Sequence, residues 1–342
     1  MSLVANLVAY LHQRGERSGV HIVAAGAQPL ELALDQQGAS RQYATVIEDE
    51  DGALRTRRIT PSARSGFTHF LDGVQQSAVI MYLGEAVPVI YGYTAAVVRQ
   101  RLSNGTMTTW RQPRSREALY FPFDLVDKGD LQAIQDAGVD CCDTGSAGAE
   151  AVRTLADIYQ RGLNAVRIAR AHLERELLAE WQAAFAQNQS AWLAVDGSLR
   201  ELTRIRETAG NIVGVVKDCR TPYFGWTDQA RIFALPAGHR TSVFQTPQIA
   251  TDPVHSWYQR LWDNTRRDLL FGLIRVELPA RSDSTTLADI ISAWLHAERS
   301  PISQPDPRWD HLIYPIHDCE QFLKSISPSV SAVQAALSSV GG

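Results

Sequence analysis

The sequence predicts an α/β fold, in which helices flank a sheet. Two short apolar runs, residues 191–195 and 212–216, have the length and composition of buried strands, and each ends at a charged residue, Asp196 or Lys217. A longer stretch, residues 149–187, repeats its apolar side chains at the spacing of a helix. Ligands tend to bind beyond the strand ends of α/β sheets, so Asp196 and Lys217 mark the expected site.

The composition is that of an ordinary globular protein. The chain has 342 residues, of which 45% are hydrophobic and 20% charged, enough for one large domain or two smaller ones. Its apolar runs are shorter than the ~20 residues that cross a bilayer, and residues 1–19 have the pattern of an amphipathic helix rather than a signal peptide. The four cysteines lack CxxC spacing, which favours reduced thiols in a cytoplasmic protein over structural zinc.

The formal net charge is −4. Proteins that bind nucleic acid unaided are usually basic on at least one face. Either nucleic acid is not the ligand, or its binding is local, assisted by a metal, or shared with a partner.

The first half of the chain is expected to be rich in strands. Residues 21–27 predict a short strand, and residues 41–60 predict a hairpin that turns at Asp51-Gly52. Further strand-like runs are residues 68–71, 77–82, 87–93 and 107–110.

The second half mixes helices and strands. Residues 117–149 look irregular apart from one short helix at 127–138, and Gly162 is a candidate kink in the long helix that follows. Beyond Lys217, the pattern predicts strands at 231–235, 242–245 and 273–278, a helix at 285–298, a proline-rich loop, and a helix that starts near His317. The tail from residue 326 is expected to be a last helix or partly disordered.

Two Asp-Gly pairs, Asp72-Gly73 and Asp196-Gly197, each follow an apolar strand-like run. Asp-Gly is also a common turn dipeptide, so either pair alone is more simply explained as a turn. Their recurrence after apolar runs is the sequence's most informative internal similarity.

Five arginines surround Trp110 in residues 99–116. They fit an edge that follows a phosphate backbone with an aromatic side chain for stacking. They fit equally a solvated hairpin that carries arginines.

Several carboxylates far apart in the sequence could converge on a divalent cation. Asp72, Asp196 and a helix glutamate would supply the oxygen ligands that magnesium and manganese prefer. Lys217 could hold a phosphate, and His317 could relay a proton near neutral pH. The structural alternatives are an ion pair for Lys217 and a capping or core histidine for His317.

Three segments resemble motifs of the NurA nucleases. WLAVDGSLRE together with NIVGVVK is similar to the second motif, FLDGVQ to the first, and YPIHDCEQF to the C-terminal motif. The resemblance spans residues 65–325, and the order of the motifs and the long helix before the second also fit.

The resemblance implies an RNase H-like fold at residues 61–325, with an N-terminal helix and hairpin extension (residues 1–60) and a C-terminal tail (326–342). It implies a manganese-dependent deoxyribonuclease, with magnesium as the other candidate ion, that has exonuclease and single-strand endonuclease activity. Such nucleases act as homodimers on a hexameric HerA-type ATPase that translocates DNA, in end processing or phage defence.

Carried over by position, the metal ligands are Asp72, Asp196 and Glu180, and Lys217 and His317 complete the catalytic site. Glu176 shares a helix face with Glu180 and is the alternative ligand. Glu174 lies on a different face.

One departure motivates a second hypothesis. Val74 stands where many relatives have serine. A catalytically inactive RNase H-like subunit that binds and regulates a partner ATPase therefore remains an alternative. A different hydrolase is less favoured because the sequence has no GxxxxGK[ST], GxSxG or HExxH motif.

Overall fold

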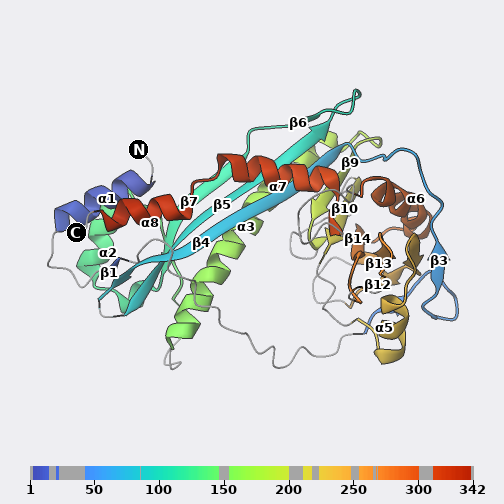
Figure 1. Ribbon diagram of the computed structural model, residues 1–342, viewed down its shortest axis with the longest axis horizontal. Coiled ribbons are helices and arrows are strands. Elements are labelled where there is room, and N and C mark those ends of the chain that lie inside the picture. The colour runs from blue at the N-terminus through green and yellow to red at the C-terminus, as the bar shows by residue number, and fades with distance from the viewer. Residues whose placement is uncertain are drawn as a thin grey trace.

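The computed structural model of the protein describes residues 3–14, 21–22, 43–84, 86–145, 154–199, 211–217, 223–247, 254–264, 267, 269–299 and 311–339. These residues form a mixed α/β structure in which one large sheet is flanked by helices, as the sequence predicts (Figure 1). Within these ranges no helix is both long and apolar enough to cross a membrane. The predicted proline-rich loop and most of the first predicted strand fall outside them.

The described residues contribute 14 strands to a single sheet. These strands are β1 (His21–Ile22), β2 (Thr45–Val46), β3 (Thr56–Arg58), β4 (His69–Leu83), β5 (Val87–Arg101), β6 (Met107–Thr109), β7 (Arg114–Phe121), β8 (Cys141–Asp143), β9 (Trp192–Asp196), β10 (Asn211–Val216), β11 (His239–Thr241), β12 (Phe244–Gln245), β13 (Val254–Arg260) and β14 (Leu273–Pro279). The main path is β2-β12-β13-β14-β10-β9-β4-β5-β7-β8, with β1, β3, β6 and β11 paired beside it.

Helices flank this sheet (Figure 1). They are α1 (Leu3–Arg14), the short 3-10 helix η2 (Phe123–Leu125), α2 (Lys128–Asp136), α3 (Leu155–Phe185), α5 (Trp226–Phe233), α6 (Ser284–Ala297), α7 (Tyr314–Ile326) and α8 (Val330–Ser338). The predicted helices at the N-terminus, at 127–138, at 285–298 and near His317 are confirmed, and the tail forms α8.

The predicted strands 68–71 and 77–82 are one continuous strand, β4. It pairs antiparallel with β5 over nearly its whole length, and the register of the pairing shifts between Val79 and Met81. Asp72-Gly73 is therefore not a turn. The chain reverses only at Gly84, whose positive φ of 58° suits glycine.

Helices α3 and α7 pack on opposite faces of the long strands. Leu71 belongs to the apolar cluster that contains Leu173 and Leu177 of α3, whereas Phe70 belongs to the cluster that contains Ile316 of α7. Successive strand residues face opposite sides of a sheet, so the two helices lie on either side of β4 (Figure 1).

Helix α3 begins at a capping box and runs unbroken for 31 residues. The Thr154 side chain accepts from the Asp157 amide, and the Asp157 side chain accepts from the Thr154 amide. The helix is not split at Gly162. Gly162 is buried, and a Cβ there would collide with Ile90 of β5, so this glycine allows close approach of helix and sheet.

The predicted hairpin at 41–60 is wrong in its pairing. Its turn is present, since Gly52 has a φ of 68°, but β2 pairs with β12 and β3 with β11 rather than with each other. The fully buried Arg240 reinforces this arrangement, because its guanidinium donates to both carboxylate oxygens of Glu48 at 2.8 Å.

Other strand predictions fail for related reasons. The apolar run at 231–235 forms the end of α5 and the turn after it, since a short apolar run does not by itself distinguish strand from helix. The segment expected to be irregular contains most of β7 and all of β8, and β13 was not predicted at all. Strand β13 buries Ser256, Gln259 and Arg260, which hides its strand character in the sequence.

Candidate active site

The two predicted aspartates lie side by side on neighbouring parallel strands. The pairing of β4 with β9 joins Phe70 to Ala194 and Leu71 to Val195, so Asp72 and Asp196 are the next residues in the same register. Neighbouring strands are about 4.8 Å apart, and residues at the same level face the same side. Asp72 is only 6% exposed, whereas Asp196 is partly exposed.

Lys217 joins the aspartates from the next strand. Strand β10 is parallel to β9 and pairs Val215 with Asp196, and Lys217 follows two residues later on the same side. Its ammonium Nζ lies 2.8 Å from Oδ1 of Asp196. Burial alone would lower the pKa of Lys217, but the negative charges of Asp196, Asp72 and Glu320 outweigh it and raise the pKa above its ordinary value.

A third carboxylate, that of Glu174, approaches Asp72 from α3. Glu174 is buried at 4% exposure, and its Oε1 lies 3.4 Å from Nε of Arg170 one turn earlier. Its carboxylate fills the space that a side chain at Gly73 would occupy, since a Cβ there would collide with Oε1. Gly73 thus lets Glu174 lie against the backbone of β4 from the α3 side, next to Asp72, whose own side chain points to the α7 side of the sheet.

Negative charge exceeds positive charge in the surroundings of Asp72. Burial, together with the negative charges of Asp196 and Glu174, raises the pKa of Asp72 well above its usual range, although Lys217 and the Gly73 amide act in the opposite direction. The Gly73 amide donates to Oδ1 of Asp72 at 2.7 Å. A cation beside Asp72 would relieve this repulsion.

The structure does not bring Glu180 to the aspartates. Glu180 receives hydrogen bonds from Arg111 at 2.7 Å and from Arg114, which lower its pKa. It lies six residues beyond Glu174, which is about 9 Å along the axis of α3 and on another face. Glu176, the alternative, is half-exposed and lies 3.3 Å from His172.

Glu174, rather than Glu180, is the glutamate of α3 that lies next to Asp72. Its position could have been found from the pattern, because Glu174, Leu177, Leu178 and Trp181 are spaced i, i+3, i+4 and i+7 and all are buried. A charged residue within an apolar helical stripe is the signal that was missed.

His317 lies on α7, which covers the aspartates' side of the sheet. The helix starts with Pro315 in its first turn, and the Cys319 thiol donates to the Phe70 carbonyl at 3.4 Å. Burial and the charge of Asp72 raise the pKa of Cys319, which places this part of α7 close to Asp72. His317 is itself 8% exposed.

The turn after Asp196 is held by a residue that sequence reasoning missed. Strand β9 ends at Asp196, and Gly197 has a φ of 107°. The Ser198 hydroxyl and the Leu199 amide then donate to Oε2 of Glu277 at 2.9 and 2.8 Å, and Glu277 is fully buried beside Arg275. In the Asp-Gly-Ser sequence the serine therefore anchors the turn that presents Asp196.

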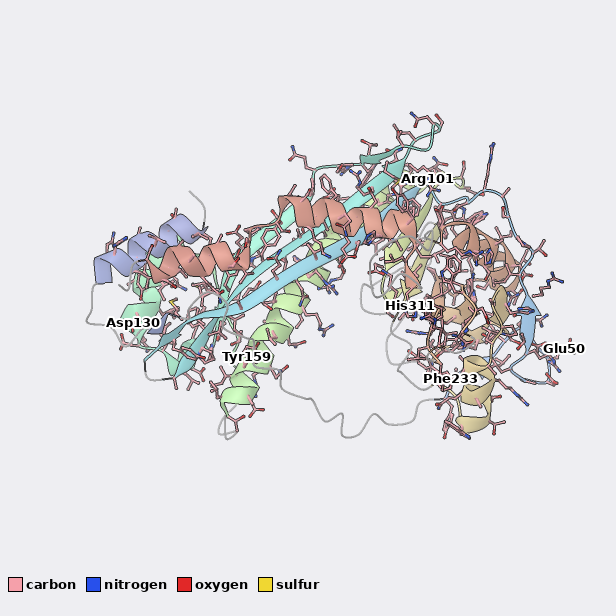
Figure 2. The ribbon with its side chains drawn as sticks, in the orientation of Figure 1. Glu50, Arg101, Asp130, Tyr159, Phe233 and His311 are labelled. Carbon is pink, nitrogen blue, oxygen red and sulfur yellow. The ribbon has the colours of Figure 1, made fainter. Side chains whose placement is uncertain are left out.

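The arginines around Trp110 are each paired with a carboxylate. These ion pairs are Arg99 with Asp318, Arg101 with Glu298, Arg111 and Arg114 with Glu180, and Arg116 with Asp140. Arg101, labelled in Figure 2, ends β5 and donates to both oxygens of Glu298. This pairing favours the structural interpretation of these arginines over an open phosphate-binding edge.

The donor chemistry of the cluster suits a hard divalent cation. Asp72, Asp196 and Glu174 offer carboxylate oxygens, which magnesium and manganese prefer, and the repulsion at Asp72 is what such an ion would relieve. Within the described ranges, however, no group of three or more His, Cys, Asp or Glu side chains is gathered as a metal site. Asp196 is instead paired with Lys217.

Comparisons with known proteins add one finding. No family model matches this chain, and no curated protein matches it. A similar solved structure is that of the NurA nuclease from Sulfolobus solfataricus, with 11% sequence identity and a TM-score of 0.46, covering 83% of this chain and 86% of that chain. A likeness of this size carries no inference about activity, so function has to be argued from the chain's own residues.

Proposed function

We propose that the protein is a divalent-metal-dependent phosphodiester hydrolase that cleaves DNA. The observation that carries the proposal is the pair of aspartates, Asp72 and Asp196, at one level of two parallel strands beside Lys217. Carboxylates arranged in this way are suited to hold hard cations, and an ammonium beside them is suited to a phosphate oxygen.

The roles of the residues follow from their places. Asp72, Asp196 and Glu174 would hold the metal, manganese or magnesium, which when bound would activate water and stabilise the leaving oxygen. Lys217 would contact a phosphate oxygen of the substrate after leaving its ion pair with Asp196. His317 would exchange a proton with the leaving group or with water. The expectation for Glu180 as a ligand is replaced in this proposal by Glu174.

An RNase H-like core is part of the proposal. The strand order β7-β5-β4-β9-β10 supports it, with three antiparallel strands first, then helix α3, then two strands parallel to β4. In chain order β4 is the first and β9 the fourth of these five strands, and the two are neighbours at the centre of this part of the sheet, where they carry Asp72 and Asp196.

DNA as the substrate and a HerA-type hexameric ATPase as the partner of a homodimer rest on the three resembling segments. The net charge of −4 and the paired arginines around Trp110 agree with a nuclease to which a translocase delivers DNA. Exonuclease and single-strand endonuclease activity, and a setting in DNA repair or antiviral defence, belong to the same proposal.

The test is Asp196→Asn, assayed on linear double-stranded and circular single-stranded DNA with manganese, with magnesium, and with a chelator. We expect the wild-type protein to cleave with manganese, to lose activity with the chelator, and Asp196→Asn to show no cleavage while its near-ultraviolet circular dichroism is retained. Repeating the assay with a HerA-type ATPase and ATP tests the partner, which should stimulate the wild-type protein.

The control is Asp228→Asn, because Asp228 is a carboxylate of α5 that pairs with Arg231 at 2.9 Å and lies outside the candidate site. It should cleave like the wild-type protein. Cleavage that survives in Asp196→Asn would remove Asp196 from the mechanism and with it this proposal.

Besides Val74, the ion pair between Lys217 and Asp196 favours the inactive-subunit alternative. Calorimetric titration with manganese separates the two functions. Binding that is lost in Asp196→Asn supports the hydrolase, whereas a wild-type protein that binds no manganese supports the inactive subunit.

A further inference from the structure

The carboxylate of Glu277 on β14 lies on the opposite side of the sheet from the carboxylate of Asp196. Glu277 is fully buried and pairs with Gly214 of β10. Val215, the next residue of β10, pairs with Asp196 and belongs to the apolar cluster on the α7 side. Successive strand residues face opposite sides of a sheet, so Glu277 faces the α3 side. It is therefore placed to act on Asp196 through the main chain rather than as a second ligand.

The turn that follows Asp196 lies close against β10. The Gly197 amide donates to the Val215 carbonyl at 2.9 Å, which continues the pairing of β9 with β10 one residue past Asp196. A Cβ at Gly214 would lie 2.9 Å from the Gly197 carbonyl oxygen and 2.9 Å from the Leu199 side chain. Gly214 thus leaves room for the turn to cross β10 and reach the side of the sheet on which Glu277 lies.

Glu277 accepts hydrogen bonds from two donors of this turn. The Ser198 hydroxyl and the Leu199 amide donate to Oε2 at 2.9 and 2.8 Å, and Leu199 is fully buried. The other oxygen, Oε1, lies 2.6 Å from Nη1 of Arg275, which supplies the counter-charge that a buried carboxylate needs. Hydrogen bonds to a carboxylate are about twice as strong as those to a neutral acceptor, so this contact fixes the turn firmly.

We propose that Glu277 is a positioning residue of the candidate site, which holds the turn at residues 197–199 and thereby sets the place of the Asp196 carboxylate relative to Asp72. The consequence for metal binding rests on the proposed function, whereas the hold on the turn can be measured without metal or DNA. Groups that orient a metal ligand without touching the metal commonly contribute about 10- to 100-fold to metal affinity.

The test compares two double variants that differ in one chemical group. Arg275→Met with Glu277→Gln keeps a carbonyl acceptor for the turn, whereas Arg275→Met with Glu277→Met removes it, and neither leaves a buried charge unpaired. Hydrogen exchange of the Leu199 amide is followed by NMR of protein labelled with ¹⁵N-leucine, and Leu199→Met identifies the signal. We expect exchange about tenfold faster in the methionine double variant than in the glutamine double variant. Equal exchange in the two would overturn the proposal.

Calorimetric titration of the same proteins with manganese measures the consequence for Asp196. We expect the Kd to be about tenfold higher in the methionine double variant than in the glutamine double variant. Equal Kd values would overturn the positioning of Asp196 by Glu277. A wild-type protein that binds no manganese would refute the proposed function, and the exchange of the Leu199 amide would then still decide whether Glu277 holds the turn.

Ser198→Ala tests the same inference if the double variants do not fold. It removes one of the two donors to Glu277 and leaves the buried ion pair in place. The control is Ser292→Ala, which removes a buried hydroxyl that accepts from Nε1 of Trp257, also at 2.9 Å. We expect Leu199 exchange to be about threefold faster and manganese binding about threefold weaker in Ser198→Ala than in Ser292→Ala. The same values in both variants would contradict the proposal.

Discussion

Gly73 shows how a residue without a side chain arranges the groups around it. It lies inside β4, next to Asp72, and the Glu174 carboxylate occupies the place where its Cβ would be. The same residue donates its amide to Asp72. Because both carboxylates contact Gly73, their relative position depends on the absence of a methyl group there.

We expect Gly73→Ala to weaken manganese-dependent cleavage at least tenfold with a modest loss of stability. The new methyl would push the Glu174 carboxylate away from Asp72, and the end of a flexible side chain can move at a cost of about 1–2 kcal/mol in unfolding free energy. Urea unfolding and cleavage rates measure the two effects. Gly225→Ala is the control, since nothing lies within 4 Å of a Cβ at that position. Full activity in Gly73→Ala would show that the contact is unimportant.

At the scale of elements, the contact between α3 and the start of β4 surrounds a histidine with aromatic rings. His69 is 2% exposed and lies 4.6 Å from Phe185 and 5.7 Å from Trp181, measured between ring centroids. Its Nδ1 lies 2.8 Å from the Thr68 hydroxyl, and its Nε2 is buried without a hydrogen-bond partner among the described residues. Burial lowers the pKa of His69 to about 4.

This contact predicts a loss of stability in mild acid. The folded-state pKa is below the unfolded value near 6.5, so the unfolded chain binds more protons between pH 6.5 and 4, and stability falls as the pH falls through that window. From pH 7 to pH 5 the loss due to His69 amounts to about 2 kcal/mol. Urea unfolding of His69→Phe should show a smaller loss over this range than the wild-type protein. His172→Gln, at an exposed position of α3, should behave like the wild-type protein. If His69→Phe loses as much stability as the wild-type protein, His69 is not the group responsible.

At the scale of the whole molecule, a buried ion pair joins the N-terminal segment around strands β2 and β3 to residues almost 200 positions later in the sequence. Glu48 precedes the turn at Gly52, and its partner Arg240, which also lies 2.7 Å from Asp289 of α6, is fully buried. Strands β2 and β3 thus share a sheet and an ion-pair network with β11 and β12.

We expect Glu48→Gln to lower the unfolding free energy by about 3 kcal/mol, because it leaves a buried guanidinium without its main counter-charge. Unfolding should remain a single transition by circular dichroism and by tryptophan fluorescence, since the strands on both sides of Arg240 belong to one sheet. Asp51→Asn, which removes an exposed partner of Arg55 from the same turn, should change stability little. Two separate transitions in Glu48→Gln would instead indicate an independent N-terminal unit.

Local sequence predicted those parts of the molecule that local forces determine. The runs before Asp196 and Lys217 are strands, and 155–185 is a helix, because their apolar spacing is unambiguous. Strand β13 could not be predicted, since its buried Arg260 is satisfied by carbonyls from distant segments, among them those of Leu235 and Leu269. The pairing of β2 and β3 likewise depends on strands almost 200 residues away.

The residues of the candidate site also differ in whether local sequence could identify them. Asp72, Asp196 and Lys217 could be identified because each follows an apolar strand run, and the sheet brings them together. Glu174 was missed because a glutamate on a helix looks like surface charge until the packing of that helix is known. Glu180 illustrates the opposite error, since its ion pairs with Arg111 and Arg114 involve residues of a loop and a strand far from it in sequence.

The spacing of Asp72 and Asp196 comes from main-chain hydrogen bonding between β4 and β9 rather than from the side chains around them. Any sequence that forms these two strands in this register reproduces it. Substitutions elsewhere in the sheet that leave both strands and their register unchanged therefore leave the spacing of the pair unchanged. The other side chains near the pair, Glu174 and His317, lie on α3 and α7, so substitutions in these helices can change the groups around the aspartates.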